Sequence, residues 1–164
     1  QGIDMTAKFT VLGNTTLATA SASVTFSSIP GGYKDLVIVT NYLGNGGESG
    51  TRYRFNSDSG ANYSYVLAQG DGSTVSWGSS SSFTGVIGFA TATATVAALQ
   101  KLQISDYAAT DKHKSVLVRS DRENQLTAMA AARWANTSAI TNITIDALGS
   151  NFAAGSTFRL LGVN

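Results

Sequence analysis

Short apolar stretches alternate with clusters of Gly, Asn and Ser about every ten residues along this chain. The stretches are rich in Val, Ile, Thr, Tyr and Phe, which favour β-strands, and the clusters are typical of turns. The pattern predicts an all-β protein, an antiparallel β-sandwich of about ten strands. We expect its strands near Ala7–Leu12, Ala20–Phe26, Asp35–Leu43, Tyr53–Asn56, Tyr63–Ala68, Val86–Thr95, Ala98–Ile104, Ser115–Arg119, Leu126–Trp134, Ile140–Ala147 and Thr157–Val163.

Alternation with a period of two residues indicates which faces are buried. Ile143 and Ile145 share one face of their segment and Thr144 takes the other. The segment Ala90–Thr95 alternates methyl and hydroxyl groups, so its alanines are expected to face a second sheet or a second subunit. Leu36–Val39 is apolar on both faces, which predicts a central strand covered on both sides.

The segment Leu126–Trp134 is open to two interpretations. Its alanines favour a helix, but it lacks a wide apolar stripe at helical spacing, so a strand is the better interpretation. The length of 164 residues indicates one domain with an arm. We expect residues 1–19 to form an N-terminal arm with a first short strand, and residues 20–164 to form the sandwich.

Charge and cysteine content exclude several classes of function. Only 13% of the residues are charged, and the net charge is +1, so no nucleic-acid partner is expected. There is no cysteine, which excludes disulfide scaffolds and thiol catalysis. The uncharged stretch Gly72–Gln100 is too polar to span a bilayer, so no membrane partner is expected. Such a surface suits packing against other subunits.

Candidate catalytic groups are sparse. His113 is the only histidine and lies in a charged turn, and no serine occupies a nucleophile elbow. Asp58-Ser59-Gly60-Ala61 matches the short aspartic-protease signature, but its residues are also ordinary hairpin residues, so we interpret it as a turn. The sequence therefore predicts no enzyme, no cofactor and no metal site.

Aromatic residues give the one candidate binding surface. Trp77 lies in a Ser/Gly-rich segment, and several tyrosines precede it: Tyr42, Tyr53, Tyr63 and Tyr65. Together they would form a platform that stacks on sugar rings or contacts a protein. The alternative is that these rings fill the core or an oligomer contact, which is their commonest use.

A set of phrases, in this order and spacing, resembles small β-sandwich virion structural proteins of tailed bacteriophages, of the capsid decoration (cement) or tail-fibre type. The phrases are Phe26-Ser27-Ser28-Ile29-Pro30, Tyr33-Lys34-Asp35-Leu36, Arg54-Phe55-Asn56 with Asp58, Gly60, Asn62 and Tyr63, Asp106-Tyr107-Ala108, Trp134 with Ala139-Ile140-Thr141, and Gly149 to Thr157. The resemblance covers nearly the whole chain from about Met5. It implies a jelly-roll-like sandwich on the virion surface, assembled as an oligomer in the host cytoplasm, with no catalytic residue to carry over.

Two roles on the virion remain open. A tail fibre needs a shaft of coiled coil or repeated β-structure, and the chain shows neither heptads nor repeats. A decoration protein needs a compact head and a short attachment segment, which the N-terminal arm with Ile3, Met5, Phe9 and Leu12 would supply. We therefore expect a homotrimeric cement protein that binds the major capsid protein or another virion protein. The alternative is a tail-fibre domain that binds host-surface glycan.

Overall fold

The computed structural model describes residues 8–123 and 126–164, and these residues form an all-β fold. Every strand pairing is antiparallel, so the predicted antiparallel sandwich is confirmed. The described residues contain twelve strands: β1 (Phe9–Thr16), β2 (Ser23–Phe26), β3 (Asp35–Tyr42), β4 (Ser49–Phe55), β5 (Tyr63–Gly70), β6 (Val75–Phe83), β7 (Val86–Ala92), β8 (Ala98–Ser105), β9 (Lys114–Arg122), β10 (Leu126–Trp134), β11 (Ile143–Gly149) and β12 (Thr157–Val163).

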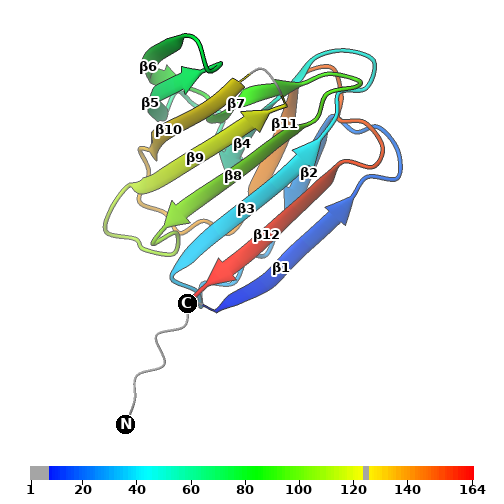
Figure 1. The fold of residues 1–164 in the computed structure, drawn as a ribbon. Helices are drawn as coiled ribbons and strands as arrows, with labels where there is room; N and C mark the ends of the chain where they lie inside the picture. The colour runs from blue at the N-terminus through cyan, green and yellow to red at the C-terminus, as the bar shows by residue number, and fades with distance from the viewer. Residues whose placement is uncertain (1–7, 124–125) are drawn as a thin grey trace.

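The strands form two layers of unequal width (Figure 1). The large sheet has eight strands in the order β1-β12-β3-β8-β9-β10-β5-β6, and the small sheet has four in the order β2-β11-β4-β7. The β5–β6 hairpin is the centre of a nested set of strand pairs, which are, from the inside outward, β4/β7, β3/β8, β2/β11 and β1/β12. The β9–β10 hairpin is an addition to the large sheet. This nesting is the rolled-up arrangement of a jelly roll, as the resemblance implied.

For most predicted strands, the structure confirms which side chains point into the core. Ile143 and Ile145 point into the core, and so do Ala90 and Ala92. The ambiguous segment Leu126–Trp134 is strand β10, because its alternate alanines face inward while the residues between them face solvent. The strand expected to be central, β3, lies inside the large sheet between β12 and β8.

Several strand boundaries differ from expectation. For example, β7 ends at Ala92 rather than Thr95, so Ala94 is exposed and does not face the second sheet. Val75–Phe83 was not predicted as a strand, because serine and glycine have low β-propensity and give no apolar alternation. It forms β6 because its register with β5 supplies the backbone hydrogen bonds. Phe9–Thr16 form β1, which pairs with β12 over its length, so this part of the predicted arm belongs to the sandwich. Ile3 and Met5 lie outside the described residues.

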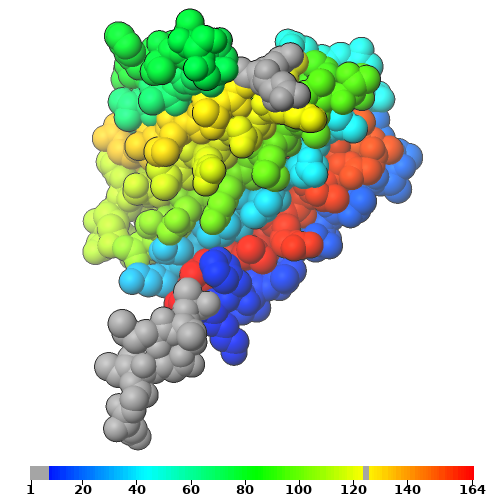
Figure 2. All heavy atoms as spheres, in the orientation of Figure 1, coloured from blue at the N-terminus to red at the C-terminus, as the bar shows by residue number. Residues whose placement is uncertain are grey.

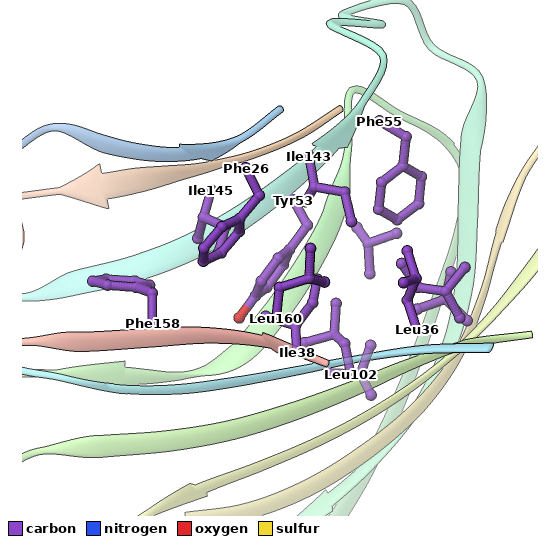
Figure 3. Close-up of a cluster of buried hydrophobic side chains, with 14 of the residues drawn as sticks. Phe26, Leu36, Ile38, Tyr53, Phe55, Leu102, Ile143, Ile145, Phe158 and Leu160 are labelled. Atoms are coloured by element: carbon purple, nitrogen blue, oxygen red, sulfur yellow. The ribbon is translucent and has the colours of Figure 1, made fainter. Parts of the chain in front are cut away.

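The core is formed where the small sheet covers the large one. Aliphatic and aromatic side chains from both layers interlock there (Figure 3). The small sheet contributes Phe26, Tyr53, Phe55, Ile143 and Ile145, and the large sheet contributes Leu36, Ile38, Leu102, Phe158 and Leu160. No helix long and apolar enough to cross a membrane occurs in the described part of the chain.

Candidate functional site

The predicted aromatic platform is not formed. Tyr42, Tyr53 and Tyr63 are at most 1% exposed and belong to the core, so they offer no ring face to a sugar. Tyr65 is half-buried, and its ring packs against Phe83 and Phe89 with centroids 5.4 and 4.9 Å away. The five-ring surface is therefore excluded, and the alternative interpretation holds for four of the rings, because alternation along β3, β4 and β5 turns them toward the core.

Two of the buried tyrosines hold a polar cluster around Gln100, a fully buried residue of β8. The Gln100 Oε1 atom accepts hydrogen bonds from Thr51 at 2.5 Å and from the Tyr53 hydroxyl at 2.8 Å. Its Nε2 atom donates to the Tyr42 hydroxyl and to the Ala90 carbonyl, both at 2.9 Å. The cluster joins the two sheets with every amide atom of Gln100 paired, so its role is structural.

Burial also prevents the hydroxyls of Tyr42 and Tyr53 from acting as acids or bases at neutral pH. Burial raises the pKa of Tyr53 to about 12 and raises the pKa of Tyr42 even further. Both hydroxyls therefore stay protonated at neutral pH and act as hydrogen-bonding groups.

The segment Asp58–Ala61, which matches the short aspartic-protease signature, forms a turn, as interpreted from the sequence. The Asp58 carboxylate accepts hydrogen bonds from Trp134 Nε1 at 2.7 Å, from the Gly60 amide at 2.9 Å and from Asn62 Nδ2 at 3.0 Å. Burial alone would raise the pKa of Asp58, but the hydrogen bonds from Trp134, Asn62 and Gly60 outweigh it and lower the pKa. A carboxylate with its oxygens engaged in this way fixes the turn between β4 and β5.

Trp77 is the one aromatic residue of the predicted set that lies on the surface. It is 85% exposed on β6, directly opposite Ala68 of β5. Its neighbour Val75 is 75% exposed and lies opposite Gly70. Both large side chains thus face cross-strand partners too small to cover them, which explains their exposure.

The outward face of the large sheet carries an apolar patch beside Trp77. Register places Val66, Ala131 and Leu117 in one row across β5, β10 and β9, and Ala68 and Met129 in the next. We call these five residues the outer apolar patch. All five are exposed, Met129 by 58%. The face is the one shown in Figure 2, where the β5–β6 hairpin stands at one end of the sheet (green).

Hollows on this face make the patch a shallow groove along β5 and β10. The patch itself lines a hollow of about 280 Å³. Towards the β5–β6 turn it continues into a hollow of about 550 Å³ that includes Val75 and Arg119. Towards the other end, a hollow of about 770 Å³ includes Ser64, Ser79 and Arg133. The groove therefore has an apolar floor and polar ends, which is typical of a contact surface.

The same face carries positive charge. Lys101 and Arg119 lie directly opposite each other on β8 and β9, Arg133 lies on β10 and Arg159 on β12. None of these four cations is in an ion pair with a carboxylate of the described residues. On the small sheet, by contrast, Asp146 lies 2.7 Å from Arg54 and 3.4 Å from Arg52. The large sheet thus offers cations beside an apolar patch, together with one exposed carboxylate, Asp121, on the same face of β9 as Arg119.

The predicted attachment residues divide between the two faces of β1. Phe9 is 55% exposed, whereas Leu12 packs against the core. Leu12 is therefore part of the folded sandwich and is not available to a capsid unless β1 separates from β12.

The remaining candidate residues do not gather into a cluster in the described part of the chain. Within residues 8–123 and 126–164, no group of three or more His, Asp or Glu side chains gathers as metal ligands would. His113 is exposed in the loop between β8 and β9. Sequence reasoning missed the outer apolar patch, although Leu117 and Met129 at outward positions of alternating strands were the available signal.

Comparison with known proteins adds a distant structural likeness. No family model matches the chain, and no curated protein matches it. A galectin of Caenorhabditis elegans, LEC-6, is a structural neighbour at 8% identity, covering 92% of this chain and 95% of that chain, with a TM-score of 0.35. At this TM-score the likeness carries no argument about function.

Proposed function

We propose that this chain is a structural protein of the virion surface of a tailed bacteriophage, and that it binds the major capsid shell as an oligomeric decoration (cement) protein. A homotrimer at three-fold positions of the capsid is one such oligomer.

The outer apolar patch is the observation that carries the proposal. Val66, Leu117 and Met129 form an apolar floor on a rigid sheet, and Arg119 and Arg133 flank it. Exposed apolar groups rimmed by charge mark protein contact sites. The cations predict a partner surface that presents carboxylates around apolar side chains, since paired charges of opposite sign favour docking.

Polar residues of the segments behind the resemblance hold loops of the fold. Asn56 Nδ2 donates to the Ala139 carbonyl at 2.8 Å, and Asn56 Oδ1 accepts from the Thr141 amide at 2.9 Å. Asp58 is bound by Trp134 as described above. These side chains are engaged in building loops, so the phrases describe a scaffold rather than a reactive centre.

Localisation in purified virions tests the proposal. We expect mass spectrometry to count the chain in hundreds of copies per particle, and cryo-EM to place it over the head. Absence of the chain from purified particles would overturn the virion role. A few copies at the tail tip would exclude the cement role and leave the tail-fibre one.

Hydroxyl-radical footprinting of the same particles tests the contact face. Met129 and Trp77 are exposed in the isolated chain, whereas Trp134 is 1% exposed and serves as an internal control. Capsid binding through the outer apolar patch should protect Met129 from oxidation. Equal oxidation of Met129 in virions and in isolated protein would exclude this face.

A tail-fibre domain that binds host glycan is the second candidate, and Trp77 is the observation that favours it. A fully presented indole beside the Ser64–Ser79 end of the groove offers a stacking face with hydroxyl groups around it. On a glycan array, Trp77→Ala should abolish binding, and Phe9→Ala on β1 is the matched control. An array with no signal for the native protein would remove this candidate.

A further inference from the structure

The edge of the large sheet at β6 is open, and it is regular over Val75–Ser80, before the register shift that separates Ser80 from Phe83. From Val75 to Ser80 the strand pairs with β5 without a register shift. Its other edge has no neighbouring strand in the described chain, so the backbone groups along that edge are free to pair. Such an edge is a ready template for a strand of another chain.

The other three sheet edges have shorter unbroken pairings than the six residues of Val75–Ser80. β2 has only four residues. β1 contains a register shift between Val11 and Gly13, and β7 pairs with β4 through a shift between Ser49 and Thr51. The stretch Val75–Ser80 has no bulge, proline or charged residue, which are the usual means of protecting an edge.

The hairpin that presents this edge is held firmly at its turn. The Asp71 Oδ1 atom accepts hydrogen bonds from the Ser73 amide at 2.9 Å and from the Thr74 amide at 2.6 Å. These bonds lower the pKa of Asp71 to about 2, so the carboxylate stays ionised at neutral pH. A pre-ordered edge loses little conformational freedom on pairing.

From these features we infer that β6 pairs with β6 of a second copy of this chain, antiparallel, about a two-fold axis perpendicular to the large sheet. With this axis, Trp77 and Val75 of both copies lie on one face of a continuous sheet. There these side chains cover the apolar surface that the small residues Ala68 and Gly70 leave open. The inference concerns self-association and does not depend on the virion role.

Charge distribution favours a second copy as the occupant. A two-fold axis places identical residues near each other, so any charge on the edge would face a like charge. The chain has no Asp, Glu, Lys or Arg between Gly72 and Gln100, which includes all of β6 and β7. The cations of the outer face, Arg119 and Arg133, lie on β9 and β10, at least two strands away from the contact.

The surface area that the contact would bury indicates the expected affinity of the dimer. Complete coverage of the two indoles would bury roughly 300–500 Å² together, which is an upper bound. With Val75 and the paired edges, the total reaches at most roughly 1,000 Å², the lower end for specific interfaces. We therefore expect a dimer with a dissociation constant in the micromolar range. This dimer differs from the homotrimer expected from the sequence.

Sedimentation velocity over a range of concentrations tests the inference. We expect a monomer–dimer equilibrium in which Ser79→Lys weakens association roughly tenfold or more, because it adds two positive charges to a contact that has none. Thr25→Lys adds the same charge at an exposed position of β2 and should leave association unchanged. In parallel, acrylamide quenching of Trp77 should fall as the dimer forms, while the buried Trp134 provides a constant background.

Three results would overturn the inference. They are a native chain that remains monomeric at about a hundred micromolar, a trimer, and a dimer that Ser79→Lys leaves as strong as the native one. Near-UV circular dichroism of each variant distinguishes loss of association from loss of folding. Since the isolated protein is used, failure here leaves the capsid test untouched.

Discussion

The indole Nε1–H of Trp134 donates to Asp58 Oδ2 at 2.7 Å, which joins the end of β10 to the turn between β4 and β5. The Trp134 ring also packs edge-on against Phe55 and is nearly parallel to Tyr63, with centroids 5.6 and 6.3 Å away. One residue thus closes this end of the sandwich by both packing and hydrogen bonding.

Replacement of Trp134 by phenylalanine should separate the two contributions. Trp134→Phe keeps an aromatic ring but removes the donor to Asp58, so the free energy of unfolding should fall by about 1–3 kcal/mol. Urea unfolding at neutral pH measures this loss. A variant as stable as the native chain would show that the hydrogen bond contributes nothing.

Acid should remove that difference. The folded chain lowers the pKa of Asp58 below its ordinary 3.8, so the ionised carboxylate contributes stability above that value. This contribution is lost as pH falls through the folded pKa. Without the Trp134 donor the folded pKa moves up, and the native and Trp134→Phe unfolding curves should converge on acidification. A stability gap that stays constant from about pH 7 to below pH 3 would contradict the assignment.

The polar cluster in the core gives a second prediction. Gln100→Leu keeps the side-chain size but leaves the hydroxyls of Thr51, Tyr42 and Tyr53 without their amide partner, so stability should fall by roughly 3 kcal/mol or more. Gln103→Leu, on the exposed face of the same strand, is the control and should change stability by about 0.5 kcal/mol or less. Chemical denaturation of both variants measures the contrast, and equal effects would refute it.

A glycine of β7 allows the small sheet to approach this cluster. A Cβ atom on Gly88 would lie within contact of Gln100 Oε1 and Thr51 Oγ1, both buried. Gly88→Ala should therefore destabilise the chain by about 1–3 kcal/mol or more through overpacking. At Gly78 of β6 a Cβ would meet nothing within 4 Å, so Gly78→Ala should be neutral in thermal unfolding at low concentration. A tolerated Gly88→Ala would show that the sheets have room to separate.

How far sequence predicted the structure depended on which signal each residue carried. Ile143 and Ile145 alternate with polar residues, and alternation sufficed to place them in the core. β6 has no such alternation, because its position is fixed by pairing with β5 rather than by burial. The tyrosines were misplaced for a related reason, since spacing along the chain does not tell which face of a strand meets the second sheet. The outer apolar patch arises only when β5, β9 and β10 are set in register.

Whether β1 is a permanent strand or a detachable arm can be tested with two adjacent residues whose side chains point in opposite directions. Leu12 packs against the core, whereas Val11 is 59% exposed on the outer face. If β1 is a permanent strand of the sandwich, Leu12→Ala should cost about 1–3 kcal/mol of unfolding free energy, and Val11→Ala about 0.5 kcal/mol or less. If β1 instead detaches to act as an attachment arm, Leu12→Ala should leave the stability of the isolated chain nearly unchanged and weaken binding to capsids. Denaturation and capsid co-sedimentation of the same two variants therefore distinguish a structural strand from an arm.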